Sequence, residues 1–140
     1  MRAIVFGAIL AATAPVMALA DTYRAVNYLN VVPLSGSSFE VIEARGEGPQ
    51  GMWCAAADYA LQRLGARGRI YILAGRGPAR KVSGRKSVVF TTNVNQLPNG
   101  PIQSTSLSTA QVGVGLPINH AIQFCRREYE LSDNLIRLNR

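Results

Sequence analysis

The two cysteines and the single histidine of this 140-residue chain could together form a nucleophilic centre. Cys54 lies one residue into an expected helix over residues 53–64, where unpaired backbone N–H groups favour the reactive thiolate. A Cys54–His120 pair would be the nucleophile and general base of a cysteine-dependent hydrolase. However, His120 precedes Cys125 by five residues on one expected helix, roughly 140° around its axis. We therefore expect its imidazole to lie in solvent, away from Cys54.

The sequence lacks the sets of residues that common zinc and dinucleotide sites require. Two cysteines cannot form an all-cysteine zinc site, and one histidine cannot form a three-histidine site. Gly46, Gly48 and Gly51 match G-x-G-x-x-G, but a dinucleotide site also needs an acidic residue about 20 positions later. Residues 59–127 contain no Asp or Glu. We interpret these glycines as a flexible connector and expect no metal and no cofactor.

The first 20 residues have the pattern of a secretory signal peptide. Arg2 supplies a positive start, an uncharged apolar run follows, and Ala18-Leu19-Ala20 is a small-residue cleavage site before Asp21. The run is too short to span a bilayer, which needs about 20 residues. We predict cleavage after Ala20, a periplasmic or secreted product of residues 21–140, and no transmembrane segment in it.

Export leads to an oxidising compartment, where the two cysteines become candidates for a disulfide. Cys54 and Cys125 lie on the apolar faces of two expected helices, 71 positions apart. In the chain-entropy model, closing a loop of that length contributes at most about 4 kcal/mol of stability. We predict a Cys54–Cys125 disulfide as a structural bond, and the hydrolase remains the alternative.

Positive charge gathers in one part of the sequence. The chain carries a formal charge of +7, yet residues 59–127 hold ten basic side chains and no acidic one. Five of the ten fall within a glycine-punctuated segment, residues 75–86, which we expect to be a loop. Such a loop attracts polymers that carry phosphate or carboxylate groups. The predicted anion-binding residues are Arg76, Arg80, Lys81, Arg85 and Lys86.

The expected partner is therefore an anionic envelope polymer, a lipid headgroup or an acidic protein. Nucleic acid is disfavoured, because no aromatic side chain lies between Arg76 and Lys86 to stack on a base. A protein-binding inhibitor or assembly factor is a further alternative that the sequence does not separate from the first.

Hydrophobic patterning predicts the elements that hold these residues. We expect an α+β domain with a small, mostly antiparallel sheet packed against two helices and stabilised by one disulfide. The expected strands are 23–32, 39–44, 69–74 and 87–93, with a weaker one at 104–112, and the helices are 53–64 and 117–130.

Residues 51–60 read Gly-Met-Trp-Cys-Ala-Ala-Ala-Asp-Tyr-Ala, and a second cysteine follows in a late helix. This run resembles small uncharacterised exported proteins of proteobacteria whose helix starts with Trp-Cys. The resemblance implies a paired-cysteine exported domain, and it implies no activity and no site residue. The leading prediction is an exported binding or envelope-associated domain of unknown ligand.

Overall fold

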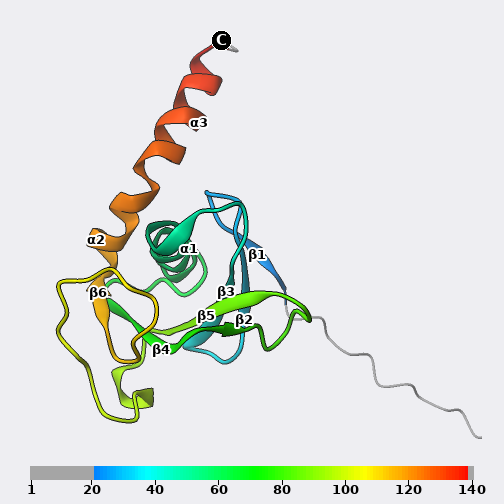
Figure 1. The fold of residues 1–140 in the computed structure, drawn as a ribbon. Helices are drawn as coiled ribbons and strands as arrows, with labels where there is room; N and C mark the ends of the chain where they lie inside the picture. Colours follow the sequence, from blue (N-terminus) through cyan, green and yellow to red (C-terminus); the bar gives the residue numbers. More distant parts are fainter. Residues whose placement is uncertain (1–20, 139–140) are drawn as a thin grey trace, which may run out of the picture.

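Short runs of β-branched and aromatic residues build a six-stranded sheet in the computed structural model, which describes residues 21–138 (Figure 1). The expected signal peptide lies outside the described residues. The strands lie in the order β1-β2-β3-β5-β4-β6, and every neighbouring pair is antiparallel. Their bounds are Tyr23–Arg24, Asn30–Pro33, Ser38–Ile42, Arg69–Pro78, Lys86–Thr91 and Gly115–Pro117 for β1, β2, β3, β4, β5 and β6. The predicted α+β class with an antiparallel sheet is confirmed.

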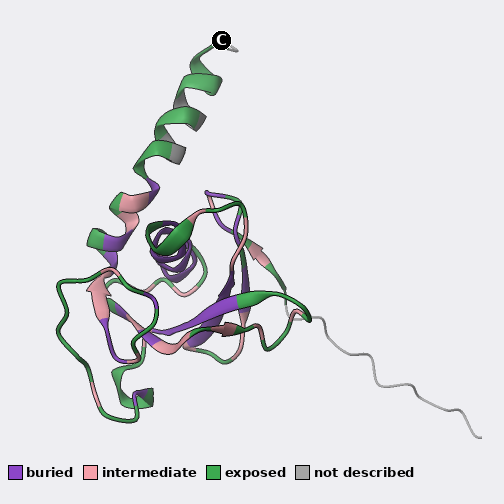
Figure 2. Ribbon diagram, viewed as in Figure 1, coloured by how far each residue is buried: buried purple, intermediate pink, exposed green. Residues whose placement is uncertain are grey.

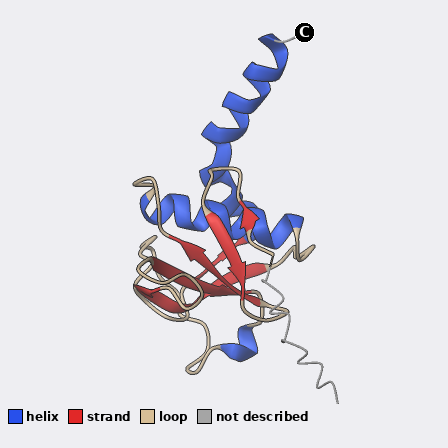
Figure 3. Cartoon of the chain, turned by 90° about the vertical axis from the view of Figure 1, so that its right-hand side faces the viewer, coloured by secondary structure: helices blue, strands red, loops and turns tan. Residues whose placement is uncertain are grey.

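One face of the sheet packs against helix α1, Gly48–Gln62 (Figure 3). Alternate strand residues such as Phe39, Val41 and Phe90 point to this face, as the two-residue period of a strand requires. The ten residues of α1 from Gly51 to Ala60 are all buried (Figure 2). Four of these are alanines, whose small side chains allow the helix to approach the sheet closely.

The opposite face of the sheet is polar at its centre and is covered by loops. Glu40, Ser87 and Thr91 are buried there, with accessibilities of 0%, 3% and 0%. The loop after β4 covers Glu40, and a short 3-10 turn, Val94–Gln96, covers Thr91 through a hydrogen bond to Gln96. Since both faces are covered, β3 is buried along its whole length.

The last helical region continues past the body of the domain. After β6 the chain forms α2 (Ile118–Ala121), a 3-10 turn η2 (Ile122–Cys125) and helix α3 (Arg126–Leu138). The Cys54–Cys125 disulfide joins η2 to α1, with a Cα–Cα distance of 5.1 Å. The predicted disulfide is therefore confirmed. Helix α3 projects away from the sheet (Figure 1) and exposes Leu131 and Leu135.

Several expected boundaries differ from the structure. The expected helix 53–64 begins earlier, at Gly48, because Pro49 fits the first turn of a helix. The expected strand 23–32 is divided into β1 and β2 by a tight turn at residues 25–29. The expected helix 117–130 is divided among β6, α2, η2 and α3. Strand β4 extends to Pro78, so the loop expected at residues 75–86 shortens to residues 79–85.

The weak strand expected at residues 104–112 is a loop. Its serines accept hydrogen bonds from backbone amides two residues later, at Ser106, Ser108 and Ala110. Such local bonds compete with the inter-strand ladder. The Trp53 indole donates to the Leu107 carbonyl at 3.2 Å, which holds this loop against α1.

Candidate anion-binding surface

The predicted basic residues lie around the hairpin that joins β4 to β5. Its loop, residues 79–85, is closed at the base by a 2.8 Å hydrogen bond from the Ala79 amide to the Arg85 carbonyl. Arg80, Lys81 and Arg85 belong to this β4–β5 loop, Lys86 is the first residue of β5, and Arg76 lies within β4. All five side chains are exposed. The structure therefore brings the predicted residues to one hairpin, although not into one loop.

A buried acid holds the tip of the β4–β5 loop. The Glu40 carboxylate accepts hydrogen bonds from the backbone amides of Arg80 (2.8 Å) and Lys81 (2.7 Å), and from the Ser87 hydroxyl (2.9 Å). These bonds fix the main chain and leave the Arg80 and Lys81 side chains free to point into solvent. Within the described residues, neither of these two side chains forms an ion pair.

Arg76 differs from the other basic residues because an acid neutralises it. Its guanidinium forms two hydrogen bonds with Glu43, from Nε at 2.6 Å and from Nη2 at 3.1 Å. The hydrogen bond from Arg76 holds the pKa of the Glu43 carboxyl below its ordinary value, and the charge of Arg76 adds to this effect. Because Glu43 already occupies two N–H donors of the Arg76 guanidinium, Arg76 is less suited to bind an external anion than the sequence predicted.

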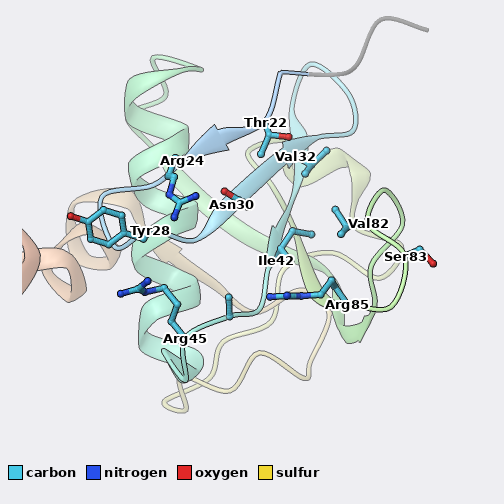
Figure 4. Close-up of a pocket in the computed structure, with 11 residues that line it drawn as sticks. Thr22, Arg24, Tyr28, Asn30, Val32, Ile42, Arg45, Val82, Ser83 and Arg85 are labelled. Atoms are coloured by element: carbon cyan, nitrogen blue, oxygen red, sulfur yellow. The ribbon is translucent and has the colours of Figure 1, made fainter.

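A cleft lies beside the β4–β5 loop, on the face of β1, β2 and β3 that points away from α1 (Figure 4). Its volume is about 420 Å³. Figure 4 shows Arg24, Tyr28 and Arg45 at one side of the cleft, with Ser83 and Arg85 across from them. The residues around it are Thr22, Arg24, Tyr28, Asn30, Val32, Ile42, Ala44, Arg45, Val82, Ser83 and Arg85.

Three arginines and no acidic side chain line this cleft. Arg85 donates from Nη2 to the Glu43 carbonyl at 2.9 Å, which orients its guanidinium and leaves further N–H donors. The Arg24 and Arg45 guanidinium carbons lie 5.8 and 5.2 Å from the centre of the Tyr28 ring, within cation–π range. The lining therefore combines positive charge with an apolar floor.

Sequence reasoning found Arg85 and missed Arg24, Tyr28 and Arg45. Residues 21–58 hold five acidic and two basic side chains, so their net negative charge gave no sign of a basic site at Arg24 and Arg45. They share the cleft with Arg85 because β1, β2, β3 and β5 are consecutive neighbours in the sheet, and no spacing within the sequence indicates this.

The structure does not form the cysteine–histidine centre of the hydrolase alternative. Both cysteines are in the disulfide, and Cys54 is buried, with an accessibility of 1%. Because α1 begins at Gly48, Cys54 is the seventh residue of the helix and not its second, beyond the first turn in which the dipole acts. His120 is exposed, as expected, and its ring contacts Phe124.

The glycine-rich connector also lacks the context of a dinucleotide site. Such a site requires a parallel strand–helix–strand unit, and β3 and its neighbours are antiparallel. Gly51 lies inside α1, where the Glu47 side chain covers it. No group of three or more His, Cys, Asp or Glu side chains that could bind a metal ion occurs within residues 21–138.

Comparisons with family models, curated proteins and solved structures give no match to this chain. Within the described part of the chain, no helix is long and apolar enough to cross a bilayer.

Proposed function

We propose that this protein is an exported binding domain that contacts anionic surfaces through the β4–β5 loop. One observation carries the proposal. The Glu40 carboxylate fixes the backbone amides of Arg80 and Lys81, while both side chains stay exposed and form no ion pair within the described residues. A rigid backbone that presents unpaired cations loses little conformational entropy when it binds an anion.

The ligand class follows from the charges. Exposed Lys and Arg side chains attract phosphate- or carboxylate-bearing surfaces over about 10 Å at moderate salt. The β4–β5 loop contains no aromatic residue, which favours an envelope polymer, an anionic headgroup or an acidic protein over nucleic acid. Binding of this kind weakens as the salt concentration rises.

Vesicles that contain an anionic phospholipid test the proposal. We expect binding at low salt to be strongly reduced by Arg80→Ser/Lys81→Ser and retained by the control Arg67→Ser/Arg127→Ser. Both double variants remove two exposed arginine or lysine charges, so the overall net charge is matched. An acidic polysaccharide and an acidic protein, tested in the same way, distinguish the partner classes. Equal binding by the two double variants, or no binding to any of the three at low salt, would overturn the proposal.

Export is tested separately, by the intact mass of the protein recovered from the producing cells. We expect a mass that begins at Asp21, with thiol alkylation occurring only after reduction. A mature protein that retains residues 1–20 would contradict the export part of the proposal. Two thiols that react without reduction would instead restore the cysteine hydrolase as the leading candidate.

A further inference from the structure

The cleft beside the β4–β5 loop contains two strained backbone positions. Among the described residues, Tyr28 (φ +67°) and Arg45 (φ +59°) are the non-glycine residues in the left-handed region. Both line the cleft, and the Arg45 guanidinium lies over the Tyr28 ring. Backbone strain of this kind costs about 1–3 kcal/mol per residue and is concentrated at functional sites.

Neither position needs a large side chain for the fold. Tyr28 ends the turn between β1 and β2, in which its amide donates to the Ala25 carbonyl at 2.8 Å. Arg45 precedes Gly46 in a turn with positive φ at both central residues. Gly, Asn or Asp usually occupies such positions, because they tolerate positive φ. A tyrosine and an arginine in these two places indicate a use for their side chains.

That use is to orient positive charge. The Tyr28 ring attracts the guanidinium groups of Arg24 and Arg45, so both are held near the cleft. Arg85 enters from the opposite side (Figure 4), fixed by its hydrogen bond to the Glu43 carbonyl. Three like charges around one cleft repel each other, and no acidic side chain lines it to offset them. An anionic ligand would remove this repulsion.

The charge and shape select the class of anion. A phosphate monoester carries about −1.5 to −2 charges at pH 7, whereas a carboxylate carries one. One planar guanidinium group can bind two phosphate oxygens at once, through two parallel N–H···O hydrogen bonds. The cleft is too large for a bare phosphate ion, and its floor of Val32, Ile42 and Ala44 suits an organic group.

We infer that the cleft bounded by Arg24, Arg45 and Arg85 is a binding site for an organic phosphate monoester, with its phosphoryl group at the arginines and its organic part on the apolar floor. The site goes beyond the proposed surface contact, since Arg80 and Lys81 do not line it. The phosphoryl group could belong to a soluble molecule or to a membrane lipid.

Calorimetric titration with phenyl phosphate, inorganic phosphate and benzoate tests the inference. We expect saturable binding of one equivalent of phenyl phosphate, weaker binding of inorganic phosphate, and the weakest for benzoate. Arg24→Gln/Arg45→Gln should weaken phenyl phosphate binding by roughly tenfold or more, because two charge-assisted contacts are lost. Arg67→Gln/Arg127→Gln is the control of equal net charge, and it should leave the affinity unchanged.

Two further arms separate this site from the proposed loop contact. Arg80→Ser/Lys81→Ser should lose binding to phosphatidylglycerol vesicles, which carry no phosphate monoester, and keep phenyl phosphate binding. Vesicles with phosphatidic acid, compared with vesicles of phosphatidylglycerol, distinguish the two sources of the phosphoryl group. If the protein prefers phosphatidic acid and Arg24→Gln/Arg45→Gln removes this preference, the phosphoryl group belongs to a lipid. If the protein shows no such preference, the phosphoryl group belongs to a soluble molecule. The inference fails if wild-type protein does not bind phenyl phosphate, if benzoate binds as tightly, or if the folded Arg24→Gln/Arg45→Gln variant, checked by circular dichroism, binds unchanged.

Discussion

Glu40 lies beneath Lys81 in the fold, and its carboxylate accepts a 2.7 Å hydrogen bond from the Lys81 backbone amide. The two residues are 41 positions apart in the chain. A carboxylate with 0% accessibility would be costly if its oxygens lacked partners. Here the amides of Arg80 and Lys81 and the Ser87 hydroxyl supply them. The acid therefore stabilises the β4–β5 loop from below, and the cations of that loop remain available above.

Glu40→Gln should loosen the β4–β5 loop without removing volume. The amide group of Gln offers one acceptor oxygen in place of two, so at least one backbone amide loses its partner. We expect a loss of about 1–3 kcal/mol in the free energy of unfolding. Amide hydrogen exchange at Arg80 and Lys81 should also accelerate relative to β5. Ser87→Ala, which removes only the hydroxyl contact, should leave this exchange nearly unchanged. Equal protection in wild type and Glu40→Gln would contradict the anchoring role.

Removing the disulfide should destabilise the whole domain. Cys54 and Cys125 join α1 to η2 across 71 positions, and both sulfurs are buried. For Cys54→Ala/Cys125→Ala we expect a loss of about 2–4 kcal/mol in the free energy of unfolding, from urea denaturation. Wild-type protein measured in reductant is the control and should show a similar loss. An unchanged denaturation midpoint in both would mean that the bond adds no stability.

The Glu43–Arg76 pair predicts the direction of an acid effect. Because the hydrogen bond from Arg76 lowers the folded-state pKa of Glu43 below its ordinary value of 4.5, deprotonated Glu43 favours the folded state. This contribution is present above pH 4.5 and is lost as the pH falls through the lowered folded-state pKa. The pair is exposed, so the effect is small. Denaturation at pH 7 and at pH 3 should show a smaller acid loss for Glu43→Gln than for wild type. An equal loss would mean that other carboxyl groups account for the acid sensitivity.

Sequence patterns predicted the parts of this fold whose signals are local or chemically distinctive. The β-branched runs around Val41 and Val88 gave the central strands, and the apolar positions of Cys54 and Cys125 led to the disulfide. The start of α1 was misplaced because Gly46 and Gly48 resemble a connector, although Pro49 favours a first turn. Residues 104–112 alternate like a strand, yet their serines satisfy the nearby backbone instead.

The candidate site was only partly predictable for a different reason. The basic cluster from Arg76 to Lys86 is contiguous in sequence, so its charge is visible there. The pairing of Arg76 with Glu43 joins residues 33 positions apart, and the sequence offers no sign of it. The cleft depends on Arg24 and Arg45 meeting Arg85 across the sheet, and on positive φ at Tyr28, which is a property of the turn and not of tyrosine.

Tyr28→Asn tests whether the strained turn serves the cleft. Asn tolerates the left-handed region that Tyr28 adopts at φ +67°, so the substitution relieves strain. The Tyr28 side chain is already 53% exposed, so little packing is lost. We expect the free energy of unfolding to stay unchanged or to rise by up to about 1 kcal/mol. Binding of phenyl phosphate should weaken severalfold, because Arg24 and Arg45 lose the ring that orients them. If Tyr28→Asn is more stable than wild type but binds phenyl phosphate more weakly, the strained backbone at Tyr28 serves binding at the cost of stability. Lower stability with unchanged binding would instead assign the ring to the fold alone.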